Sequence, residues 1–128
     1  MEVVSPLGGR ILVPTRLLYR SQDPLAVQLL FWDDLKGMVP WVFARDLLAA
    51  GTRAPSGDGD VRVWPGESGA EALLHLSLSS PYGSAHLVAP LPVIEEWLWR
   101  TYRLVPAGGE AEALNLDARL AEFLDGAP

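Results

Sequence analysis

The sequence predicts an α+β fold: an antiparallel sheet of about six or seven strands, packed with a short middle helix and two C-terminal helices. Short runs that alternate apolar and polar residues recur through the first 90 positions, with turn residues between them. A run of helix formers interrupts them after residue 43, and residues 91–105 repeat apolar side chains at helical spacing. The length of 128 residues suits a single domain over residues 1–128.

The N-terminal strands are expected over Ile11–Tyr19, Ala26–Trp32 and Met38–Phe43. Proline cannot donate a hydrogen bond to a neighbouring strand, so Pro14 predicts that the first of them lies at a sheet edge or carries a bulge. Both faces of the second strand are partly apolar. The segment Asp33–Gly37 predicts a hairpin connection to the third.

A short helix is predicted over Ala44–Ala50. It is only about two turns long, so packing of Leu47 and Leu48 has to hold it in place. Gly51 is expected to cap its C-terminus in the left-handed conformation.

Three more strands and two helices complete the prediction. The strands are expected over 61–64, 73–79 and 84–89, and Pro65 and Gly66 are expected to end the first of these. The helix Leu91–Leu104 has Pro92 in its first turn, a favourable position for proline. Asn115 is predicted to be the N-cap of a terminal helix over Leu116–Leu124. The core stripe of the helix Leu91–Leu104 is predicted to contain Leu91, Ile94, Leu98, Thr101 and Val105.

Composition and charge exclude several classes of protein. The absence of cysteine excludes disulfides, thiolate metal sites and a cysteine nucleophile. The sequence has no apolar run long enough to cross a bilayer and no basic signal-peptide start, which indicates a cytoplasmic protein. The net charge of −6 is carried entirely by residues 65–128. Such an acidic chain disfavours nucleic-acid binding, because that affinity comes mostly from neutralising phosphates.

No catalytic, cofactor or metal site is predicted. His75 and His86 could lie on neighbouring strands, but two imidazoles without a third ligand make a weak zinc site. Asp58 and Asp60 are interpreted as turn residues, since calcium needs six or more oxygen ligands. No glycine-rich phosphate-binding motif occurs. The sequence therefore predicts a protein that is not an enzyme and has no small-molecule substrate.

The aromatic residues instead indicate a protein-interaction surface. The helical wheel places Trp99 off the core stripe, between Glu95 and Arg103. An exposed tryptophan is typical of interface hot spots. The candidate protein-interface residues are Trp99, Trp32, Glu95 and Arg103, and a shoulder of the core remains the alternative for Trp99.

Four segments resemble the SsgA/SsgB family, the sporulation and cell-division regulators of filamentous actinobacteria. The run Trp41–Gly51 looks like the family signature, and Gly57–Pro65 matches its Gly-x-Gly-Asp-Val-Arg-Val-Trp-Pro motif. Asp23–Val27 is similar to its Asp-Pro-Tyr-Ala-Val, with Leu25 in place of tyrosine, and residues 79–90 match its next hairpin. The resemblance covers about residues 12–125.

The resemblance implies a non-enzymatic adaptor for sporulation septation. Its partners would be the tubulin-like protein FtsZ, which it would recruit and help to assemble, and an SsgA-like paralogue. It would act at the division septum, with a peripheral contact to the membrane as one possibility. The implied fold is a partly barrel-like, Whirly-like sheet with helices, assembled as a homotrimer. The Whirly likeness also supplies the alternative function, single-stranded nucleic-acid binding.

Two features depart from the family pattern. Family members carry an additional N-terminal strand, whereas only Met1–Gly9 precede the first clear strand here. Arg20 stands where an acidic residue is common.

Overall fold

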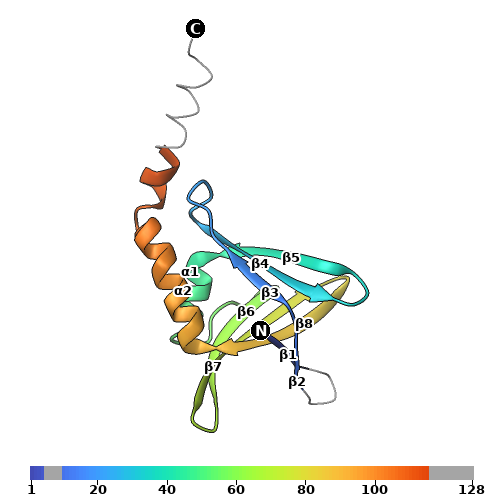
Figure 1. The fold of residues 1–128 in the computed structure, drawn as a ribbon. Coiled ribbons are helices and arrows are strands. Elements are labelled where there is room, and N and C mark those ends of the chain that lie inside the picture. The colour runs from blue at the N-terminus through green and yellow to red at the C-terminus, as the bar shows by residue number, and fades with distance from the viewer. Residues whose placement is uncertain (5–9, 116–128) are drawn as a thin grey trace.

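The computed structural model describes residues 1–4 and 10–115, and over these residues it has eight strands in two antiparallel sheets (Figure 1). The five-stranded sheet has the order β2-β1-β8-β7-β6, and the three-stranded sheet has the order β3-β4-β5. Helix α1 follows β5, helix α2 follows β8, and residues 110–115 are also helical. The elements are β1 (Glu2–Val4), β2 (Arg10–Leu12), β3 (Thr15–Leu18), β4 (Ala26–Asp33), β5 (Gly37–Ala44), α1 (Arg45–Gly51), β6 (Val61–Ser68), β7 (Glu71–Ser80), β8 (Gly83–Pro90) and α2 (Leu91–Leu104).

One hydrophobic core lies between the two sheets and the helices. Each sheet contributes the residues of one face: Val27, Leu29, Phe31 and Phe43 come from the three-stranded sheet, and Val63, Leu74, Leu76, Leu78, Leu87 and Ala89 come from the five-stranded sheet. Leu48 of α1 and Ile94 and Leu98 of α2 cover the same core. The α+β class is confirmed, but the expectation of one sheet with six or seven strands is wrong.

Pro14 explains why the strands divide between two sheets. The predicted continuous strand 11–19 is interrupted at Val13 and Pro14, so β2 joins one sheet and β3 joins the other. The Val13 N–H donates to the carbonyl of Met1, whereas the Pro14 carbonyl accepts from the Trp32 N–H. The chain therefore changes hydrogen-bonding partners at the residue that cannot donate. Both β2 and β3 are edge strands, as the proline predicts.

The N-terminal strand that the family pattern implies is present. Strand β1 pairs with β2 on one side and with β8 on the other. Strand β1 begins at Glu2, so the residues before the predicted strand Ile11–Tyr19 are enough to form an additional strand.

Helix α1 differs from its prediction at Gly51. This glycine is the last helical residue rather than a left-handed cap, and Thr52 ends the helix in the right-handed conformation. A Cβ at position 51 would lie 2.3 Å from Cγ1 of Val63. Glycine is therefore required here because α1 packs closely against β6. The predicted packing of Leu47 and Leu48 against the core is confirmed.

Helix α2 has the predicted bounds, Leu91–Leu104, with Pro92 in its first turn. Ile94, Leu98, Thr101 and Val105 of the predicted stripe are buried. The predicted N-cap at Asn115 is wrong, because the helical residues already begin at 110. The predicted helix over Leu116–Leu124 lies outside the described residues.

The guanidinium of Arg45 joins α1, α2 and the helical residues after α2. Only 1% of Arg45 is exposed. Its Nη1 donates to the carbonyls of Thr101 and Val105 at 3.1 and 2.8 Å. Its Nη2 donates to a carboxylate oxygen of Glu110 at 2.8 Å. Arg45 thus adds a second donor to the Thr101 carbonyl, which also accepts from the Val105 N–H, and supplies a donor to the carbonyl of Val105, the residue that follows α2.

Two aromatic rings and one carboxylate complete this buried cluster. The Arg45 guanidinium lies over the rings of Tyr102 and Tyr19, at 4.1 and 4.8 Å from their centres. Burial raises the pKa of both tyrosines. Hydrogen bonds from its own backbone N–H and from Arg45 lower the pKa of Glu110 below its ordinary value of 4.5. The carboxylate therefore stays charged opposite Arg45 near neutral pH.

The outward face of the five-stranded sheet carries an aromatic cluster. Trp64 of β6 stacks on His75 of β7 at 5.3 Å with an angle of 3° between the rings. Nδ1 of His75 lies 2.9 Å from Nε2 of His86 on β8. The predicted neighbourhood of the two histidines is thus confirmed. Strand β6 also extends through Pro65 and Gly66 instead of ending there, and a side chain at Gly66 would reach within 2.8 Å of the His75 ring.

Replacing Arg45 by lysine should lower the free energy of unfolding by about 2–3 kcal/mol, because lysine cannot serve both carbonyls and Glu110 at once. Urea denaturation followed by circular dichroism measures the change. The matched control is Arg100→Lys: Arg100 is exposed and pairs with Glu96 on the surface of α2. That control should change stability by less than about 0.5 kcal/mol. Equal effects of the two substitutions would contradict the role of Arg45.

Stability should also fall as the pH drops below 6.5, the ordinary pKa of a histidine side chain. Burial first, and the neighbouring charged groups second, lower the pKa of His75 and His86 in the folded protein. The unfolded chain therefore binds more protons just below pH 6.5, and the contribution of the pair is present above that pH and is lost as the pH falls through the lowered values.

Thermal melting at pH 7.5 and 5.5 tests this dependence. His86→Gln should reduce the difference between the two melting temperatures, because it removes one of the titrating groups. A variant that keeps the full wild-type difference would show that other groups cause it.

Candidate protein-interaction site

The exposed face of α2 carries a tryptophan among charged side chains. Trp99 is 60% exposed, so the alternative of a core shoulder is not what the structure shows. The guanidinium of Arg103 lies over its ring, 4.9 Å from the ring centre. A cation over a tryptophan ring is attracted to its negative face, which helps to hold the ring in position.

Further charges surround this tryptophan. Glu95 is exposed one helical turn before Trp99. Arg100 donates to Glu96 at 2.8 Å, and both side chains are about two-thirds exposed. Together, Glu95, Glu96, Trp99, Arg100 and Arg103 define what we call the α2 face. A large apolar ring bordered by charges of both signs is the composition of an interface hot spot with a polar rim.

The structure places Trp32 elsewhere. It lies near the end of β4, 44% exposed, with its indole N–H donating to Asp34 at 2.9 Å. Figure 1 shows the β4–β5 turn and α2 on opposite sides of the molecule. The four predicted interface residues thus form two sites: Trp99, Glu95 and Arg103 share the α2 face, and Trp32 belongs to a separate surface.

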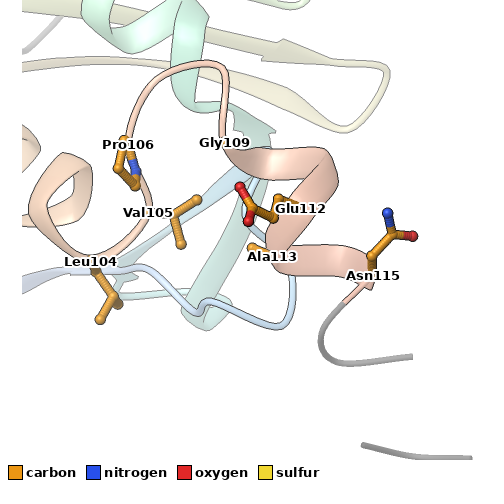
Figure 2. Close-up of a pocket in the computed structure, with 7 residues that line it drawn as sticks. All are labelled: Leu104, Val105, Pro106, Gly109, Glu112, Ala113 and Asn115. Atoms are coloured by element: carbon orange, nitrogen blue, oxygen red, sulfur yellow. The ribbon is translucent and has the colours of Figure 1, made fainter. Parts of the chain in front are cut away.

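A pocket of about 550 Å³ follows the end of α2 (Figure 2). Its lining comes from the last residues of α2, the loop after it and the helical residues 110–115, with Glu112 and Asn115 as the only side chains that carry polar groups. Two polar side chains on an otherwise apolar lining do not define a ligand, and we assign none to this pocket.

Chemistry other than protein binding has little support in the described part of the chain. Residues 1–4 and 10–115 contain no group of three or more metal-ligating side chains. No helix within them has the length and apolar character to cross a membrane. His75 and His86 bond to each other, and no third ligand joins them within the described ranges.

Sequence reasoning missed two features that position these surfaces. Arg45 and Glu110 hold the end of α2, yet they are 65 positions apart and follow no spacing rule. The second is the exposed apolar surface that includes Met38 and Val42, because the predicted strand Met38–Phe43 carries no statement of which side chains face outward. Side chains alternate along a strand, so Met38 and Val42 lie on the face opposite to that of Phe43, and this alternation could have identified them.

Comparison with known proteins gives the family. The family model described as "Streptomyces sporulation and cell division protein, SsgA" matches residues 13–110. The sporulation-specific cell division protein SsgB of Streptomyces coelicolor is 46% identical over 112 residues, which cover 88% of this chain and 82% of that protein. SsgB of Thermobifida fusca is 39% identical over 124 residues, covering 97% and 90%.

Solved structures agree with this similarity. The crystal structure of an SsgA-like sporulation-specific cell division protein from Thermobifida fusca matches with a TM-score of 0.85 and 38% identity, over 95% of this chain and 89% of that one. A structure from a study of SsgB mutations in Streptomyces coelicolor matches with a TM-score of 0.82 and 43% identity, over 88% of each chain. The relatives are cell division proteins rather than enzymes. The chain therefore belongs to the SsgA family and is an SsgB-like, sporulation-specific cell division protein.

Proposed function

We propose that this protein is a non-enzymatic adaptor that recruits FtsZ to sporulation septa and promotes its assembly through protein contacts. The observation that carries the proposal is the α2 face, where Trp99 is 60% exposed and bordered by ordered charges. The solved relative from Streptomyces coelicolor comes from work in which mutations in SsgB correlate with longitudinal cell division during sporulation. A role for this chain in placing the division machinery is consistent with that link.

The remaining partners follow from the same proposal. The chain acts as one domain over residues 1–128, in the cytoplasm at the division septum, with an SsgA-like paralogue as a second partner. A peripheral contact to the membrane accompanies this location. Its copies associate into a homotrimer of partly barrel-like, Whirly-like subunits. Self-association supplies several α2 faces to one FtsZ polymer, which strengthens binding without any new contact.

Single-stranded nucleic-acid binding is the weaker alternative. Such proteins combine a basic groove with a row of stacking aromatic rings. Here the exposed rings of Trp99, Trp32 and Tyr82 lie on α2, on β4 and in the β7–β8 turn. The net charge is −6. The charge and the scattered rings both favour the adaptor.

Trp99→Ala should weaken co-sedimentation with FtsZ polymers about tenfold or more, because truncating a hot-spot tryptophan removes the largest apolar contact of the α2 face. The measurement is the fraction pelleted against FtsZ concentration, with FtsZ from the same organism. Val93→Ala is the matched control: Val93 is 59% exposed on the same helix and points about 120° away from Trp99.

Circular dichroism should be unchanged in both variants, because both side chains are exposed. Equal pelleting of wild type, Trp99→Ala and Val93→Ala would exclude the α2 face as the contact. Absence of pelleting by the wild type would count against direct recruitment of FtsZ.

A gel-shift titration with a single-stranded oligonucleotide at low salt should show no complex, since phosphate binding comes mostly from clustered cations and this chain has a net charge of −6. A shift that weakens steeply with added salt would instead support the alternative function.

A further inference from the structure

The outward face of the three-stranded sheet is apolar. Odd-numbered residues of β4 and β5 point into the core, so the even-numbered residues point outward. The register pairs Trp32 with Met38 and Gln28 with Val42. Trp32, Met38 and Val42 are 44%, 41% and 61% exposed. We call this surface the β3–β5 face; its outward residues are Arg16, Leu18, Gln28, Leu30, Trp32, Met38, Pro40 and Val42.

The other sheet shows what a solvent-facing surface looks like in the same molecule. Its outward residues on β6, β7 and β8 include Arg62, Ser77 and His86, which the register places side by side. A sheet with one solvated face normally alternates apolar and polar residues in this way. The β3–β5 face departs from that pattern, as a surface covered by another chain does.

Pro40 indicates that a chain covering this sheet packs on the β3–β5 face and does not add a strand along the free edge of β5. The Arg45 N–H donates to the Leu25 carbonyl, which makes this a hydrogen-bonded pair and fixes the alternation along β5. Even-numbered residues of β5 therefore direct their backbone groups towards the free edge of the sheet. Pro40 has no N–H to offer there, so an added strand would lose a hydrogen bond at its centre.

The β3–β5 face has a protruding end and a hollow end. Trp32 and Met38 protrude beside the β4–β5 turn, where Leu35 is 96% exposed. At the other end, a hollow of about 310 Å³ is lined by Leu18, Gln28 and Val42. The hollow has space for one large side chain, so the face offers both halves of a contact between identical molecules.

Charge also favours a second copy of this chain. Arg16 is the only charged side chain among the eight outward residues, so the face itself carries no carboxylate although each chain has a net charge of −6. Arg20 and Asp23 line the hollow, and Asp34 and Lys36 lie beside Trp32, so each end carries both signs. Neither end therefore repels the other.

We infer that Trp32 of one copy enters the hollow between Leu18, Gln28 and Val42 of the next copy, and that this contact holds the copies together. The inference rests on the self-association in the proposed function and names the surface that carries it. If each of two copies inserts its Trp32 into the other, the contact forms a closed dimer. If each copy inserts its Trp32 into the next one around a symmetry axis, the contact forms a ring.

The face alone is smaller than the area that each partner of a stable complex buries, so the contact must include neighbouring apolar residues. Strand spacing and rise give the face a flat area of roughly 330 Å². Each partner of a stable complex buries about 800 Å². Leu35 and Tyr82 extend the apolar surface, because the Lys36 ammonium donates to the Tyr82 carbonyl at 3.1 Å and joins the two turns that carry them.

Light scattering over a hundredfold range of protein concentration tests the inference. Val42→Glu places a carboxylate in the hollow and Trp32→Ala removes the protruding ring, so each should raise the dissociation constant of self-association at least about tenfold. Val93→Glu is the matched control, because Val93 is 59% exposed against 61% for Val42 and lies on α2. Circular dichroism checks that all variants fold.

The outcomes separate this inference from the proposed function. Loss of assembly in Val42→Glu and Trp32→Ala, with normal assembly of Val93→Glu, supports the contact. Assembly of either face variant with wild-type affinity overturns it and leaves the homotrimer standing. A wild-type protein that stays monomeric overturns both the homotrimer and the contact. The Trp99 experiment with FtsZ remains informative in each case.

Discussion

The buried guanidinium of Arg45 is the interaction on which the arrangement of the functional surfaces depends. A helix that ends inside a protein leaves carbonyl groups without partners, and burying them unpaired costs free energy. Arg45 donates to the Val105 carbonyl just past α2 and, together with the Val105 N–H, to the Thr101 carbonyl, and it pairs with Glu110 in the next helical segment. Its own charge is compensated by that carboxylate and by two tyrosine rings. The direction of α2, and with it the exposure of Trp99, is therefore fixed from the core.

Prolines and glycines determine how the sheets are divided and how closely the elements approach. Pro14 ends the pairing of one sheet and begins that of the other, while Pro40 occupies an edge position where its missing N–H disrupts no existing pair. Gly51 and Gly66 lie where a side chain would meet Val63 and the His75 ring. These four residues act through sterics and missing donors, so they shape the molecule without contributing to its core.

Periodicity predicted what depends on neighbours in sequence. The bounds of α2, four of the five residues of its buried stripe and the position of Trp99 off that stripe followed from helical spacing. The division into two sheets did not, because alternation tells which face of a strand is buried and not which strand lies beside it. Arg45 and Glu110 were missed for the same reason: their pairing depends on a fold that brings together positions 65 residues apart. Trp32 was identified as an interface residue but grouped with the wrong surface, since sequence gives no distance between β4 and α2.

The two surfaces are separated in a way that suits an adaptor. Figure 1 places α2 on one side of the molecule and the β4–β5 turn on the other, and the α2 face and the β3–β5 face have no residue in common. A polymer partner presents the same site repeatedly, and an assembly of several copies presents several α2 faces to it. Once one face is bound, the next binds at a high effective concentration, which raises the overall affinity without strengthening any single contact. A modest interface around one tryptophan is then sufficient for recruitment, provided that the copies are held together elsewhere.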